Sequence, residues 1–370
     1  MSRFFDLISK PAREMGLYTP VPPSPSVQSE TEPRLVKLDS NENPFGPSPN
    51  AIEAMKLVIA NSSAYPDDDC GELCRALAAY HDLPADHIMV TAGSTALLGL
   101  LCQTLLGPRL NAVTSQRSFI VYSLAVQAAG ADLIEAPMRD DTFDPGALLD
   151  AIDKNTRLVF LANPNNPTGT MLEASVIDRF LSWVPADVVV VLDEAYYEFA
   201  THFASLRGTV YSQSLEYVRR GASVVVLRTF SKAHGLAGLR VGYGLGPAEL
   251  LSYCAHMRNT FSVSTVAQAA AMAALHDQNH IAQVVTSNAV QSPLLAEALS
   301  EFGFRVTPTC ANFLHCDVGR DASELATRLR AEGVSVRPLG PWGAPNCIRV
   351  TIGTPEQNQF FLAAVSKILV

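Results

Sequence analysis

The stretch VVVLRTFSKAHGLAGLRVG, residues 224–242, decides the predicted fold. Its first four residues have the length and branched side chains of a buried parallel strand, and Lys232 follows just past the carboxyl end of that strand. Open α/β sheets bind their ligands at this edge. An amine held against an apolar wall among cations favours the neutral form, so Lys232 can attack a carbonyl and form a Schiff base. The alternative is a surface lysine in a loop.

The residues around this lysine suit a phosphate group. Thr229 and Ser231 offer hydroxyl groups, and Arg240 offers a guanidinium fork. Residues 91–98, TAGSTALL, join a short strand to a helix expected over 96–106. The free amides at the amino end of such a helix bind anions, so the stretch predicts a site for a phosphate-bearing aldehyde.

Two further apolar runs end in polar residues. Residues 188–192 stop at Asp193, whose carboxylate would keep a facing pyridine nitrogen protonated; capping of the next helix is the alternative. Residues 158–161 lead into NPNNPTG at 163–169. A cis X-Pro bond in this loop would fix the Asn166 amide in one direction, whereas a plain connecting turn is the alternative. The intervals between the three strands each hold a crossover helix.

In these segments the chain resembles a fold type I pyridoxal 5′-phosphate (PLP) enzyme of the class I/II aminotransferases, nearest to the histidinol-phosphate aminotransferase branch. The resemblance covers most of the chain, and it depends on the order and spacing of the segments together. It implies an α/β fold with a large domain, whose mostly parallel sheet is flanked by helices, and a smaller C-terminal α/β domain. The matching segments are residues 38–49, 65–67, 163–169, 193–196, 231–232 with 240, and 348–353.

The resemblance implies a role for each matching residue around the cofactor ring. Lys232 would hold the aldehyde as a Schiff base and, once displaced by substrate, move the proton between Cα and C4′. Asp193 would pair with the pyridine nitrogen. Asn166 and Tyr196 would hydrogen-bond the phenolic oxygen, and Phe119 would stack on the ring face.

The resemblance also assigns the phosphate and the substrate. Tyr65 is similar to the tyrosine that reaches the phosphate from the neighbouring subunit, so it implies a homodimer. Arg349 would bind the α-carboxylate of the substrate beside Asn166. Arg349 also alternates with apolar Ile348 and Val350 along an expected strand; a solvent-side arginine in a weak ion pair is the alternative. The phosphate-binding positions on the same chain are Ser94, Thr95, Thr229, Ser231 and Arg240.

The chain departs from the family pattern at two places near this site. Ala96 stands where an acidic residue is common, and Gln116-Arg117-Ser118 replaces the usual Pro-Pro-Thr before the stacking aromatic. Arg117 brings a cation near the ring, which indicates either a structural variation or an unusual substrate. The region of Tyr18 also differs from the common arrangement for histidinol phosphate.

The composition predicts two domains that share one cleft. The chain has 370 residues, of which 48% are hydrophobic and only 17% are charged, as suits surface buried between subunits. We expect an N-terminal arm over 1–40, a large PLP-binding domain over 41–254 and a small C-terminal domain over 255–370. Apolar residues at 4–8 and the proline-rich segment 20–33 lie in the arm.

Within the small domain, residues 265–302 are expected to be helical. Strands are expected at 304–306, 313–316, 334–337 and 348–352, around a helix at 322–331.

Charge and cysteine content narrow the partners and the location. A net charge of −9 opposes binding to nucleic acid or to an anionic membrane, and no apolar run is long enough to span a bilayer. No signal peptide is visible, and seven cysteines without a Cys-x-x-Cys pair suit a cytoplasmic protein. His276 and His280 have the spacing of a metal pair but no third ligand, so we expect no metal.

These residues predict a PLP-dependent aminotransferase that works by a ping-pong mechanism on small molecules. It would move an amino group between an L-amino acid, or an amine like histidinol phosphate, and a 2-oxo acid. A decarboxylase, oxidase or cyclase on the same fold stays open, because the same cofactor serves all of them. A non-catalytic PLP-binding regulator is a minor alternative. The sequence does not identify the amino donor, the acceptor or the pathway.

Overall fold

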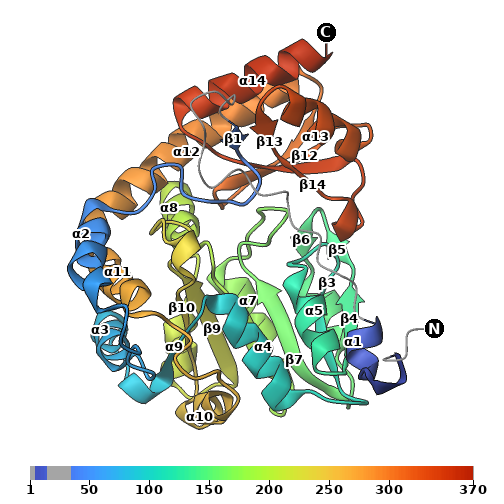
Figure 1. Ribbon diagram of the computed structural model, residues 1–370. Coiled ribbons are helices and arrows are strands. Elements are labelled where there is room, and N and C mark those ends of the chain that lie inside the picture. The colour runs from blue at the N-terminus through green and yellow to red at the C-terminus, as the bar shows by residue number, and fades with distance from the viewer. Residues whose placement is uncertain (1–4, 15–34, 370) are drawn as a thin grey trace.

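A seven-stranded sheet forms the centre of the computed structural model, which describes residues 5–14 and 35–369 (Figure 1). Its strands are β2 (Ile88–Thr91), β3 (Asn111–Ser115), β4 (Asp132–Ala136), β7 (Thr156–Ala162), β8 (Val189–Asp193), β9 (Val224–Thr229) and β10 (Gly242–Leu245). They lie in the order β2-β10-β9-β8-β7-β3-β4. Only β10 runs antiparallel to its neighbours, so the sheet is mostly parallel, as predicted.

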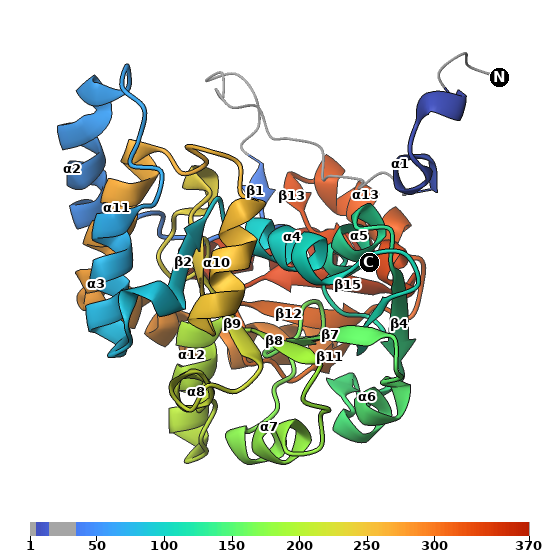
Figure 2. The ribbon, with the colours of Figure 1, turned by 90° about the horizontal axis from the view of Figure 1, so that it is seen from below.

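The three strands expected from apolar runs, β7, β8 and β9, lie next to one another in the middle of this sheet. Their branched residues are almost all buried because helices cover both faces of a parallel sheet. In Figure 2, α4, α5 and α10 cover one face, and α6, α7 and α8 cover the other. The helices are α4 (Ser94–Leu105), α5 (Val121–Ala128), α6 (Pro145–Ala151), α7 (Ala174–Leu181), α8 (Tyr197–Arg207), α9 (Ser214–Arg219) and α10 (Ala248–His256).

A second, four-stranded sheet with its own apolar core lies above the carboxyl ends of the large sheet (Figure 1). It contains β11 (Arg305–Thr307), β12 (Phe313–Asp317), β14 (Arg337–Pro338) and β15 (Cys347–Thr351). Its order is β11-β12-β15-β14, and every pair is antiparallel. The core also includes residues of α12 (Gln278–Glu301), α13 (Ala322–Ala331) and α14 (Pro355–Leu369).

One predicted strand of this region is divided in the structure. Residues 334–337 form two short strands, because β13 (Val334–Ser335) pairs with β1 (Val36–Lys37), whereas Arg337 pairs within the four-stranded sheet. The other three expected strands and the helix over 322–331 are confirmed. The helical stretch 265–302 is broken at Asp277, which ends α11 (Thr265–His276) and caps α12 through a hydrogen bond from the His280 amide.

The remaining elements lie at the edges. Helices α2 (Pro49–Val58), α3 (Gly71–His81) and α11 stack at one side of the molecule (Figures 1 and 2). Five 3₁₀ turns and a short hairpin complete the described part: η1 (Phe5–Leu7), η2 (Ile59–Asn61), η3 (Ala85–His87), η4 (Ala237–Leu239), η5 (Gly340–Trp342), β5 (Met138–Arg139) and β6 (Thr142–Phe143).

The arm is described only in part. Its short helix α1 (Lys10–Glu14) lies against α5, and Phe5, Leu7 and Ile8 are exposed. Phe4, Tyr18 and the proline-rich segment 20–33 lie outside the described residues.

Candidate active site

A cavity of about 210 Å³ lies where β7, β8 and β9 of the large sheet end. It brings together every cofactor residue predicted from the sequence except Tyr65. Its lining residues are Ser94, Thr95, Phe119, Ala162, Pro164, Asn166, Asp193, Ala195, Tyr196, Thr229, Ser231, Lys232 and Arg240. Because carboxyl ends of parallel strands meet at one edge, side chains far apart in sequence converge there.

Lys232 lies at the wall of this cavity with its amine directed to the chain near residue 40. Lys232 Nζ donates a hydrogen bond to the Ser40 carbonyl oxygen at 3.0 Å. Burial, together with the positive charges of Arg349 and Arg240, lowers the pKa of Lys232 to about 7. The amine is therefore largely neutral from about pH 7 upward, and a neutral amine is the form that attacks an aldehyde.

Asp193 ends β8 and faces the same cavity. Its Oδ2 accepts a hydrogen bond from the Tyr122 hydroxyl at 2.8 Å, and its Oδ1 accepts one from the Ala195 amide at 3.2 Å. Burial raises the pKa of Asp193 to about 6, although the Tyr122 hydrogen bond opposes this rise. The carboxylate does not cap α8, which begins at Tyr197, so the alternative of a helix cap does not hold.

Tyr122 is a functional candidate that the sequence analysis missed. Its ring is fully buried, stacks on Phe160 at a centroid distance of 4.7 Å and meets Phe119 edge-on. The available signal was its position three residues after Phe119, in the first turn of α5. A buried tyrosine hydroxyl needs a partner, and here that partner is Asp193.

The end of the cavity near Arg240 and Ser231 has the donors that a phosphate requires. Arg240 Nη1 donates to the Ser231 hydroxyl at 3.3 Å, and the Thr229 hydroxyl donates to Ser231 Oγ at 3.0 Å. Helix α4 begins at Ser94 after Gly93, which has φ +80° and offers no capping side chain. A Cβ at Gly93 would lie 2.5 Å from Arg240 Nη2, so glycine lets the guanidinium approach the helix end. These amides, hydroxyls and guanidinium fit the phosphate of PLP.

The asparagine loop 163–169 brings Asn166 to the cavity wall. The bonds before Pro164 and Pro167 are both cis. Asn166 Oδ1 accepts a hydrogen bond from Arg349 Nη1 at 2.6 Å. The loop is therefore more than a connecting turn, because it joins the cavity to the four-stranded sheet.

Arg349 and Arg337 line a second cavity of about 140 Å³, which shares Phe119, Asn166 and Lys232 with the first. The Arg349 side chain is only 5% exposed and also donates to the Asp39 carbonyl oxygen at 2.8 Å, so it does not lie on a solvent-exposed face. Arg337 on β14 stands directly opposite Arg349 on β15.

Three further residues near the cavities were not assigned roles from the sequence. Asn41 Nδ2 donates to the Tyr196 hydroxyl at 2.9 Å, and Trp342 lines the second cavity with Arg337. Asn41 lies in the matching segment 38–49, which was a signal. Arg337 and Trp342 gave no signal beyond the place of Arg337 at the end of a predicted strand.

Tyr65 lies outside both cavities. It is 81% exposed and stacks on Phe261 at a centroid distance of 4.5 Å. Within one chain it therefore does not reach Arg240 or Ser231 at the phosphate end of the cavity.

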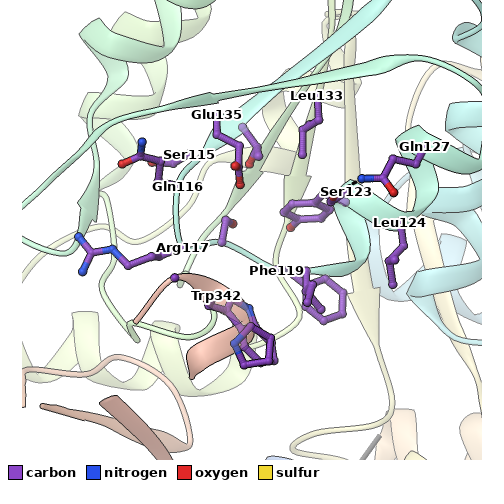
Figure 3. Close-up of a pocket in the computed structure, with 16 residues that line it drawn as sticks. Ser115, Gln116, Arg117, Phe119, Ser123, Leu124, Gln127, Leu133, Glu135 and Trp342 are labelled. Carbon is purple, nitrogen blue, oxygen red and sulfur yellow. Dashed lines mark hydrogen bonds between the residues drawn. The ribbon is translucent and has the colours of Figure 1, made fainter. Parts of the chain in front are cut away.

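A groove of about 640 Å³, larger than either cavity, is also lined by Phe119 (Figure 3). Trp342 and Ile120 line both this groove and the second cavity, whereas Lys232 and Asp193 do not line the groove. The groove therefore lies beside the candidate active site.

Among residues 5–14 and 35–369, no three His, Cys, Asp or Glu side chains form a group that could hold a metal ion. No helix in that part of the chain has the length and apolar character needed to cross a membrane.

Comparison with known proteins agrees with this geometry. The family model of class I and II aminotransferases matches residues 33–365. The chain is 41% identical to histidinol-phosphate aminotransferase 2 of Pseudomonas aeruginosa, covering 100% of this chain and 99% of that protein. It is 40% identical to the histidinol-phosphate aminotransferase of Moorella thermoacetica, covering 95% and 90%.

A solved structure shares the fold. The histidinol-phosphate aminotransferase of Sinorhizobium meliloti, in complex with pyridoxal-5′-phosphate, superimposes with a TM-score of 0.84 at 29% identity, covering 91% of each chain. These relatives favour transamination over the decarboxylase, oxidase, cyclase and regulator alternatives. The chain belongs to the class I and II aminotransferase family and is a PLP-dependent aminotransferase.

Proposed function

We propose that the amino donor is an amine with an anionic group, of the type of histidinol phosphate, and that a 2-oxo acid accepts the nitrogen in the second half-reaction. The observation that carries this proposal is the pair Arg337 and Arg349, which stand opposite each other on neighbouring strands and line the same cavity beside Lys232. Two guanidinium groups suit a phosphate or a carboxylate. The curated relatives with this activity support the same substrate and a role in amino-acid biosynthesis.

We further propose how the residues of the first cavity act. Bound PLP supplies an electron sink for the carbon from which a proton is removed. Lys232 would bind the aldehyde and then move the proton between Cα and C4′, because its amine is neutral near pH 7. Asp193 would pair with the ring nitrogen. Ser94, Thr95, Thr229, Ser231 and Arg240 would hold the phosphate.

The remaining roles concern the ring and the substrate. Phe119 would stack on the ring, and Asn166 and Tyr196 would hydrogen-bond its phenolic oxygen. Arg349, beside Asn166, would bind the anionic group of the substrate. The hydrogen bond between Arg349 and Asn166 supports this, because it places substrate and ring contacts within one connected group.

Replacing Arg337 with Gln should raise KM for histidinol phosphate about tenfold or more, because a hydrogen bond to a charged group contributes roughly 1.5–3 kcal/mol. The kcat should change little, because in this proposal Arg337 binds the phosphate, which is distant from the amine that reacts. Histidinol, which lacks the phosphate, serves as the control substrate, and its kcat/KM should change less than about threefold. An equal loss for both amines would show that Arg337 does not bind the phosphate.

We also propose a homodimer in which Tyr65 completes the partner's site. Exposed apolar residues next to α2, namely Leu57, Ile59, Tyr65 and Phe261, support an interface at this side of the molecule. A tyrosine that is 81% exposed and stacked on Phe261 is available for contact with another chain.

Mixing two defective variants tests this arrangement. Lys232→Ala and Tyr65→Ala subunits, refolded together in equal amounts, should regain about a quarter of wild-type activity, because half of the dimers are mixed and each has one intact site of two. Lys232→Ala mixed with Asp193→Asn is the matched control and should regain none, since both residues come from the same chain. Lack of recovery in the first mixture would contradict the proposed role of Tyr65.

The domain division and the location remain proposals. We propose a large domain over 41–254 and a small one over 255–370, which the two separate sheets and cores support, although α11 packs in the core of the large sheet. We propose a cytoplasmic location, because all seven cysteines are free thiols, as is usual in a reducing compartment.

A further inference from the structure

Arg117, one of the departures from the family pattern, forms an ion pair away from the ring. It lies at φ +49° in the turn that precedes Phe119, and its guanidinium extends away from the Phe119 side chain (Figure 3). Arg117 Nη1 lies 2.9 Å from Asp141 Oδ1. The Asp141 side chain is 11% exposed and that of Arg117 is 34% exposed, so the pair is more shielded than a typical surface ion pair.

Asp141 contacts both the turn before Phe119 and the four-stranded sheet. It lies in the turn of the hairpin β5–β6, where Asp140 and Asp141 both have positive φ. Its second carboxylate oxygen, Oδ2, accepts a hydrogen bond from the Thr307 hydroxyl at 3.4 Å and lies 3.6 Å from Arg305 Nη1. Both partners are on β11. One carboxylate thus joins the turn before Phe119 to the four-stranded sheet.

The same hairpin is bonded to the loop that carries Asn166. The Thr170 hydroxyl donates to the Asp141 carbonyl oxygen at 2.8 Å. Asn165 Nδ2 donates to the Arg117 carbonyl oxygen at 3.0 Å, and the Ser118 hydroxyl donates to Asn165 Oδ1 at 2.9 Å. The hairpin, the turn before Phe119 and the asparagine loop therefore form one hydrogen-bonded group.

On the other side, β11 is connected in register to the substrate arginines. Thr307 pairs with His315, His315 with Arg349 and Arg349 with Arg337 across the four strands. Residues directly opposite each other in a sheet have their side chains on one face. Thr307 Oγ1 also lies 3.0 Å from His315 Nδ1. A row of polar side chains therefore runs from Asp141 to the cavity of Arg349 and Arg337.

We propose that Asp141 is a positioning residue that sets the place of Arg349 relative to Phe119 and Asn166. It acts through Arg117 on the ring side and through Thr307 and His315 on the substrate side. Loss of the carboxylate removes one link between the two sides and leaves the hydrogen bond from Arg349 to Asn166. The turn before Phe119 and the strand that carries Arg349, which would both contact the same substrate, would then move more independently. The proposal rests on the role proposed for Arg349 in binding the anionic group.

The test uses two variants and a matched control. Asp141→Asn removes the charge and keeps a similar shape, and Arg117→Gln removes the partner charge. Arg139→Gln is the control, because Arg139 is on the same hairpin and forms a 3.0 Å ion pair with Asp144, but is 79% exposed. In kinetics with histidinol phosphate, the two test variants should raise KM about tenfold while kcat stays within about threefold, because misplacement weakens binding more than chemistry.

A second measurement is independent of turnover. Hydrogen exchange of the protein without cofactor should become faster at 116–119 and at 305–307 in both test variants, and should stay unchanged in Arg139→Gln. The double variant Arg117→Gln/Asp141→Asn should be no worse than either single variant, since the pair acts as a unit.

Several outcomes would overturn the proposal. These are unchanged exchange in both segments, an unchanged KM, a parallel loss in kcat and KM, or the same effects in Arg139→Gln. Failure of the proposed function would be distinct, because the wild-type protein would then fail to turn over histidinol phosphate, while the exchange measurement would still test the link between the two segments.

Discussion

Replacing Lys232 with Ala should lower the rate of amino transfer at least about 10³-fold, because the variant lacks the amine that we propose binds the aldehyde and moves the proton. Burial lowers the pKa of this amine to about 7, so near neutral pH it can act as a base without first losing a proton to solvent. Single-turnover absorbance measurements with saturating amino donor would give the rate directly.

Two controls separate this effect from damage to the fold. Lys232→Arg keeps a positive charge but cannot act as a base at neutral pH, so it should be as inactive as the alanine variant. Lys56→Ala changes an exposed lysine that pairs with Glu53 on α2, and it should keep wild-type activity. Substantial turnover by Lys232→Ala would contradict the role given to this lysine.

Replacing Asp193 with Asn should lower kcat by about 10²–10³-fold, the usual effect of removing one group that stabilises charge in a water-excluded site. An amide cannot keep the ring nitrogen protonated, so the ring would accept electrons poorly. Asp193→Glu keeps the charge and should recover part of the rate. A rate for Asp193→Asn within threefold of wild type would contradict the pairing of this carboxylate with the ring.

The pKa of Asp193 also gives the direction of a pH effect. Because burial raises it to about 6, the carboxyl is ionised above that pH and neutral below it. Affinity for PLP should therefore fall as the pH decreases through 6 in the wild-type protein. The Asp193→Asn variant should not show this step, because its amide does not titrate there.

The central strands could be predicted from sequence because strands buried on both faces are continuous apolar runs. β10 could not, since Gly242 and Gly244 give it no such pattern. The structure explains these glycines by packing: a Cβ at Gly242 would lie 2.5 Å from the Ser94 amide nitrogen, and one at Gly244 would lie 2.2 Å from Leu97 Cδ2. The split of residues 334–337 into two strands was equally hidden, because pairing with β1 depends on a segment about three hundred residues away.

The site was predictable where its residues follow strands. Asp193 ends β8, Asn166 and Lys232 follow β7 and β9, and the shared edge of a parallel sheet brings the three together. Tyr122 and Arg337 were missed because their roles depend on which residue they face in space. The role proposed for Tyr65 depends on a second chain.

The most direct test is to reduce the PLP-loaded protein with borohydride, digest it and locate the pyridoxyl group by mass spectrometry. We expect one modified peptide, labelled at Lys232, and no label in the Lys232→Ala variant. A label on another lysine, or no label in the wild-type protein, would contradict this expectation.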